Sequence, residues 1–158
     1  MSQGNSVSAA EAARMICGVL LRTIVFEEVV AAPSLKQALD GPESKARAAE
    51  FCAFAGHACL AAVVAAGEDP DAVARELDDA VGASFVGGGS EAGAAAERRA
   101  EFAAVADAGD AALGAALGAH VGAAEDAEFA VAAGRLHAKL VAVAGETFKE
   151  MKEQGTIR

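Results

Sequence analysis

The sequence has no tryptophan and no tyrosine, and it has only three prolines, three cysteines and three histidines. Aromatic and β-branched residues favour strands, and few are present apart from valine, so a β-rich fold is disfavoured. Three cysteines are too few, and odd in number, for the disulfide framework of a small secreted domain, which favours a reducing, cytoplasmic location. The scarcity of histidine argues against haemerythrin-like sites, and the absence of any Glu-x-x-His pair argues against di-iron bundle sites.

Alanine accounts for roughly 44 of the 158 residues and has the highest helix propensity of all residue types. Leucine, isoleucine, valine and phenylalanine together make up only about a fifth of the chain, just above the level typical of disordered proteins, so we expect a lean core. The length favours a single domain covering residues 1–158. Alanine, glycine and arginine all have GC-rich codons, and their abundance favours a bacterial source.

The chain carries 13 basic and 23 acidic residues, for a net charge of −10. Such a surface repels a phosphate backbone, so nucleic acids and anionic membranes are disfavoured as partners, whereas a basic protein partner, or solubility alone, fits better. Residues 51–67 have no formal charge, but this alanine-rich segment is at the lower length limit for a membrane span, and we expect a helix of a protein core. Glu11 and Arg14 precede the first apolar run, unlike in a secretory signal.

Capping signals divide the chain into four long helices and one or two short ones. Ser8 followed by Glu11 is a capping box for the first helix, and Pro70 suits the first turn of another. We expect helices over residues 8–32, 34–39, 42–67, 70–84, 90–119 and 124–154, with residues 1–7 disordered and 86–90 forming a flexible glycine-rich joint. Short connections favour an all-α, antiparallel bundle. The joint lacks the lysine of a phosphate-binding loop, so we interpret it as a linker.

The first helix is almost wholly apolar, and we expect it to be the most buried element. In a regular α-helix Glu27 shares a face with Ile16, Leu20 and Ile24. A buried carboxylate must be paired, hydrogen-bonded or protonated, and such groups concentrate at functional sites. Glu27 is therefore a candidate catalytic residue, unless the end of the helix carries it into solvent.

The segment from Cys52 to Cys59 resembles a set of metal ligands at first sight. In a helix the two thiols share the apolar face, but His57 points about 140° away from Cys52, on the polar edge, so one ion cannot reach all three. Cys17 could approach from the first helix to complete a three-thiolate site, yet zinc sites usually have closer cysteine pairs in loops. Ordinary buried thiols are the simpler interpretation, and we expect no bound metal and no cofactor.

His120 and His137 both lie on or beside apolar stripes of the last two predicted helices. In a hairpin of these helices the two rings are about 15 Å apart, too far to share an ion. His137 is a candidate catalytic residue, and a locally hydrogen-bonded imidazole at the edge of the core is the alternative.

Glycine recurs every fourth residue at Gly114, Gly118 and Gly122. Each glycine inside a helix costs about 1 kcal/mol relative to alanine, so the repeat calls for a reason. We interpret it as an interface where another helix, from this chain or from a second subunit, approaches closely; a frayed helix end is the alternative.

Two functions remain. The first is a non-enzymatic interaction protein, such as an adaptor, a chaperone-like subunit or an immunity or antitoxin-type partner, and we expect it to form a homodimer. The second is a bundle, enzymatic or not, that binds a small ligand or metal in an internal pocket near Glu27, His137, Cys52 and Cys59. A cavity lined by these residues would favour the second function, and a solid core with an exposed apolar patch would favour the first.

Overall fold

Helices make up nearly all of the computed structural model, which describes residues 6–40, 44–82 and 91–157. Within these ranges there is no strand, and the one β pairing is an isolated parallel bridge between Val7 and Ile157. The prediction of an all-α fold is confirmed. The backbone N–H of Val7 donates to the carbonyl of Thr156 at 2.8 Å, so this residue is held in place although we expected it to be disordered.

Most helices begin and end within a few residues of their predicted bounds. The capping box of Ser8 and Glu11 is present, and Asp126 caps the last helix through the backbone N–H of Phe129 at 3.0 Å. The glycine-rich joint at 86–90 lies outside the described residues. The elements are α1 (Ala9–Leu20), a π-helical turn (Leu21–Val25), α2 (Phe26–Ala31), α3 (Pro33–Leu39), α4 (Ser44–Ala65), α5 (Pro70–Gly82), α6 (Glu91–Val105), α7 (Asp110–His120) and α8 (Ala127–Glu153).

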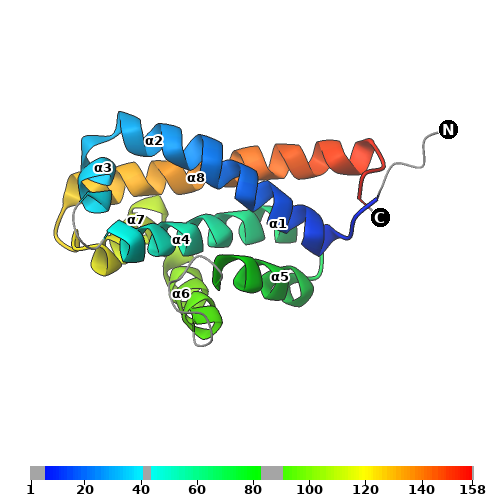
Figure 1. Cartoon of the computed structure of the whole chain (residues 1–158), viewed down its shortest axis with the longest axis horizontal. Helices are drawn as coiled ribbons and strands as arrows, with labels where there is room; N and C mark the ends of the chain where they lie inside the picture. Colours follow the sequence, from blue (N-terminus) through cyan, green and yellow to red (C-terminus); the bar gives the residue numbers. More distant parts are fainter. Residues whose placement is uncertain (1–5, 41–43, 83–90, 158) are drawn as a thin grey trace.

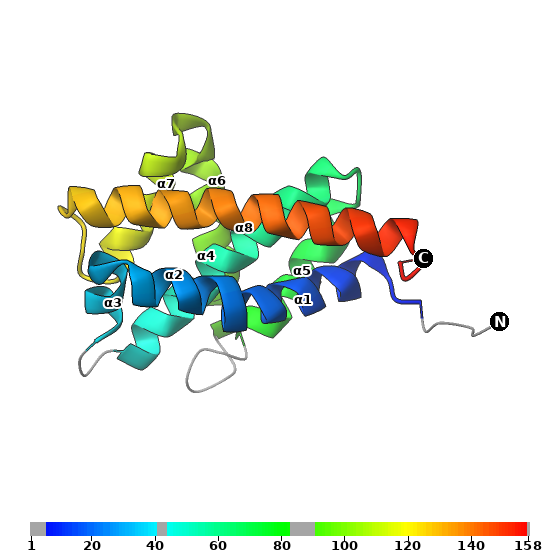
Figure 2. The same ribbon diagram turned by 90° about the horizontal axis from the view of Figure 1, so that it is seen from above.

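The α1–α2 helix and α8 run in opposite directions along the long axis of the molecule (Figure 1). Figure 2 shows them side by side, with α4 passing beneath both. Helices α1, α5, α6 and α8 all pack against α4, which is why its residues from Phe51 to Cys59 are almost all buried. Within the described chain, one segment, Arg47–Ala65 of α4, is long and apolar enough to cross a membrane, and 67% of it is buried by the rest of the protein.

The predicted fourth helix, 90–119, is broken into α6 and α7. After a short 3₁₀ turn at Ala106–Ala108, Gly109 has a φ of 108° and a ψ of 175°, a conformation that no helix contains and that glycine tolerates best. The break lets α6 run steeply to α7 and α8 (Figure 1). The prediction of one long helix here is wrong, and the regular bundle of four long antiparallel helices is not confirmed.

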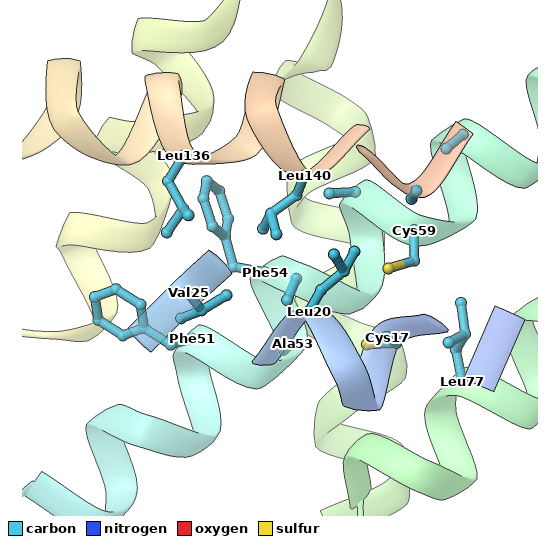
Figure 3. Packing of buried hydrophobic residues seen from close by; sticks show 14 of the residues in the cluster. Cys17, Leu20, Val25, Phe51, Ala53, Phe54, Cys59, Leu77, Leu136 and Leu140 are labelled. Carbon is cyan, nitrogen blue, oxygen red and sulfur yellow. The ribbon is translucent and has the colours of Figure 1, made fainter. Parts of the chain in front are cut away.

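The π-helical turn changes which side chains of the first helix face the core. Before it, Ile16 and Leu20 are buried four residues apart; after it, the next buried residues are Val25 and Val29. The step from Leu20 to Val25 is five residues because a π turn contains one more residue than an α turn. Figure 3 shows Leu20 and Val25 among Phe51, Phe54 and Leu136 in the core.

Candidate functional site

Two of the three predicted interface glycines lie inside the chain, between α7 and α8. A Cβ atom on Gly114 would be 1.9 Å from the carbonyl oxygen of Ala130, and one on Gly118 would be 2.7 Å from that of Ala123. Gly134 of α8 makes the same kind of close contact from the other helix, since a Cβ atom on it would be 2.5 Å from the carbonyl oxygen of Asp110. Gly114 and Gly118 therefore mark a close approach of two helices of this chain, which is one of the two possibilities that the sequence left open.

Gly122, the third glycine of the repeat, does not contact α8 in this way. It is exposed in the loop after α7 with a φ of 75°, which suits glycine. It lines a cleft of about 660 Å³ with Arg47, Asp40, Glu125 and Asp126. Neither Glu27 nor His137, the two residues that we predicted to be catalytic, lines this cleft.

His57 and His137 form a pair that the sequence did not predict. The Nδ1 atom of His57 lies 2.8 Å from the Nε2 atom of His137, and both residues are buried. His57 is buried, rather than on a polar edge, because other helices surround α4. Two phenylalanine rings lie against the pair. The ring centroid of Phe54 is 5.1 Å from that of His137, and the ring centroid of Phe102 is 5.9 Å from that of His57.

Burial keeps this histidine pair neutral. It lowers the pKa of His137 to about 4, and burial, His137 and Arg99, in that order, lower the pKa of His57 to about 4 as well. At neutral pH one imidazole donates the shared hydrogen bond and the other accepts it. Because aromatic rings pack against the pair, it suits a structural link between α4 and α8 better than proton transfer to a substrate.

The thiols of Cys17 and Cys59 are hydrogen-bonded to each other across α1 and α4. Their sulfur atoms approach each other below α8 (Figure 3). The hydrogen bond from Cys59 lowers the pKa of Cys17, and the same bond together with burial raises the pKa of Cys59. Cys52 does not complete a three-thiolate site: within the described residues, no group of three or more His, Cys, Asp or Glu side chains could hold a metal ion.

His120 takes part in a chain of charged side chains at the surface. Its Nε2 atom lies 2.6 Å from Oε2 of Glu101, and the other carboxylate oxygen of Glu101, Oε1, accepts a hydrogen bond from Arg98 at 3.2 Å. Arg98 also donates two hydrogen bonds, at 2.6 and 3.0 Å, to the mostly buried carboxylate of Glu50. The hydrogen bond from His120, followed by the nearby positive charges, lowers the pKa of Glu101. These contacts fasten α4, α6 and α7 together.

Glu27 does not lie on the buried face, and its selection as a candidate site is wrong in this respect. It is exposed, because the π-helical turn rotates α2 relative to α1 by about one residue position. Glu28 takes the place that a regular helix would give to Glu27. It is partly buried and accepts a hydrogen bond of 2.5 Å from Lys139 of α8, which raises the pKa of that lysine.

The most unusual surface of the described chain is an apolar row on the α1–α2 helix. Met15 is 54% exposed, Val19 49%, Phe26 64% and Val30 59%, and we call these four residues the outer stripe. They form two pairs, each one helical turn apart, and the exposed polar residues Arg22 and Thr23 of the π-helical turn lie between the pairs. The prediction that this helix is the most buried element is therefore wrong, because only one of its faces covers α4 and α5.

Comparison of the chain with protein-family models, curated proteins and solved structures finds no match. Three described clefts have volumes of about 660, 380 and 490 Å³, and none is lined by Glu27, His137, Cys52 or Cys59. Large exposed apolar side chains, in contrast, are present on α1 and α2.

Proposed function

We propose that this chain is a non-enzymatic interaction protein that binds an amphipathic helix of a protein partner along the outer stripe. The observation that carries this proposal is the exposure of four large apolar side chains, between 49% and 64%, on one helix. Helices that dock in this way contribute apolar residues one turn apart, which is how Met15 and Val19, and again Phe26 and Val30, are spaced.

The rest of the molecule supports a docking role for this helix. The opposite face of α1–α2 is fixed to the core by Ile16, Leu20, Val25 and Val29, so the stripe is presented on a rigid support. We propose that the α1–α2 helix and α8 form part of an antiparallel bundle, and that this bundle is the support that holds the stripe in place. Neither Glu27 nor His137 lines any of the three clefts, and Cys17, Cys52 and Cys59 form no disulfide with one another, as suits a cytoplasmic protein.

Site-specific photo-crosslinking tests the proposal. A photoreactive phenylalanine analogue replaces Phe26 in one variant and Val64 in a control variant, because Val64 is also exposed (38%) but lies at the end of α4. We expect irradiation in the host cell to join position 26, but not position 64, to a helical segment that mass spectrometry identifies in the partner. Equal yields at the two positions would refute the proposal.

A further inference from the structure

Two of the three cysteines meet in the core although they are far apart in the sequence. Cys17 lies on the face of α1 that packs against α4, and Cys59 of α4 follows it 42 residues later. The two sulfur atoms approach each other between these helices (Figure 3), and the thiol of Cys59 donates a hydrogen bond to that of Cys17. Thiols that already share a hydrogen bond need only a small movement of their side chains to form a disulfide bond.

The fold prevents the cysteine pairing that an unfolded chain would favour. Cys52 and Cys59 are seven residues apart in α4, so their Cα atoms are about 10 Å apart along the helix, whereas a disulfide needs them within about 7 Å. In an unfolded chain the shorter loop closes at the smaller entropic cost, and the seven-residue loop forms about ten times as often as the 42-residue loop. The packing of α1 on α4 therefore selects Cys17 as the partner of Cys59.

We infer that Cys17 and Cys59 form a thiol–disulfide switch, which hydrogen peroxide converts into a disulfide that joins α1 to α4. This inference goes beyond the proposed function and does not depend on it. Cys17 is only 3% exposed and Cys59 0%, so a bulky oxidant such as a peptide disulfide is excluded, whereas peroxide is about as small as water. Peroxide reaches the thiols when α1 opens locally from α4, and the disulfide then prevents further opening.

The reaction consumes one peroxide molecule and two thiols. Cys17 attacks first, because the hydrogen bond from Cys59 lowers its pKa and favours its thiolate. Its sulfur bonds to one peroxide oxygen, the O–O bond breaks, and the departing hydroxide takes up the proton that Cys17 has released. The sulfur of Cys59 then attacks the sulfenic acid of Cys17, the S–O bond breaks, and this second hydroxide leaves as water with the proton of Cys59. The two sulfurs lose two electrons in total, and the peroxide gains them.

Peptide mapping without reduction tests which cysteines are joined. The parent chain is treated with hydrogen peroxide once in its folded state and once in concentrated urea. We expect the link between Cys17 and Cys59 to be the main product of the folded chain, and the link between Cys52 and Cys59 to exceed it about tenfold in urea. Cys52→Ser, the matched control, should leave the main product of the folded chain unchanged.

Three results of this mapping would overturn the inference. The first is a folded chain that joins Cys52 to another cysteine as often as it joins Cys17 to Cys59. The second is sulfinic acid at Cys17 without any link, since a resolving thiol in contact would have captured the sulfenic acid. The third is a folded chain in which peroxide oxidises Cys52 completely and leaves Cys17 and Cys59 reduced.

Thermal unfolding measures what the disulfide does to the fold. The linked chain should have a Tm about 5–15 °C above that of the reduced chain, because a cross-link between residues 42 positions apart restricts the unfolded chain. Prolonged incubation with dithiothreitol should restore the original Tm. Cys17→Ser keeps a hydroxyl group that can accept from Cys59, and peroxide should not raise its Tm. A linked parent chain whose Tm is unchanged or lower would refute the switch, and this comparison needs no variant.

Discussion

The α7–α8 hairpin and the α1–α2 helix are both rich in alanine and aliphatic residues, yet the hairpin is closely packed within the chain, whereas one face of the α1–α2 helix is exposed. In the hairpin, glycines on both helices let the two backbones meet, and a single added methyl group would overlap a carbonyl oxygen. The α1–α2 helix has large side chains on two opposite faces, and the chain covers only one of them. Small residues thus complete contacts within the chain, whereas the large residues of the outer stripe remain uncovered by it.

The largest expected effect is a loss of stability in acid, caused by the buried pair His57 and His137 that links α4 to α8. Because the pKa values of His57 and His137 are lowered to about 4 in the folded chain, the unfolded chain takes up their protons first, near pH 6.5. The contribution of the two histidines to the free energy of unfolding is therefore fully present above about pH 6.5. It falls as the pH drops toward 4, by about 3 kcal/mol for each histidine at most. Urea unfolding at a series of pH values measures this loss.

The control for this prediction is His137→Gln, which keeps an amide that can bond to His57 but removes one of the two titrating groups. The variant should lose about half as much stability as the parent between pH 6.5 and 5, a range above the ordinary pKa of carboxylates. An identical pH dependence in the two proteins would show that the pair does not control acid stability.

A methyl group at Gly114 should have the next largest effect. Gly114→Ala forces the backbones of α7 and α8 apart at Ala130, and we expect it to lower the free energy of unfolding by about 2–3 kcal/mol. Gly145→Ala is the matched control within α8. No atom lies within 4 Å of its added methyl group, so the higher helix propensity of alanine should raise stability by up to about 1 kcal/mol. Changes of the same sign in both variants would contradict the close approach.

Thiol labelling shows whether α1 stays closed over the core. Cys17 and Cys59 are buried between α1 and α4, whereas Cys52 is only partly buried, so iodoacetamide should modify Cys52 first in the native chain. Peptide mass spectrometry over time measures the three rates. Modification of Cys17 at the rate of Cys52 would mean that α1 separates from α4 readily.

The smallest effect distinguishes two adjacent carboxylates on α2. Glu28→Gln removes the partner of Lys139 and should lower Tm slightly, and less so at high salt. Glu27→Gln should leave Tm unchanged within error, since the Glu27 side chain is exposed. The reverse order would mean that the helix continues through residues 21–25 without a π turn.

Several local features could be predicted from the sequence because they depend on neighbouring residues. The capping box at Ser8, the proline start of α5 and the buried side chains of α8 at Phe129, Leu136 and Leu140 all follow from spacing within one helix. The histidine pair could not be predicted, because His57 and His137 are 80 residues apart and meet only through the packing of α4 against α8. The exposed residues of the outer stripe could not be predicted either, because an almost wholly apolar helix gave no reason to choose its exposed face.

The sequence by itself determined that this chain is helical, where most helices begin and end, and that its core is lean, since these follow from propensity, capping and composition. Tertiary structure alone decided which faces are covered. Because of the π turn, Val25 and Val29 are buried and Glu27 is exposed. Because of the break at Gly109, α6 and α7 run in different directions. The physical reason is that each of these outcomes costs a local hydrogen bond or conformational preference, and only the burial gained against distant helices can offset that cost.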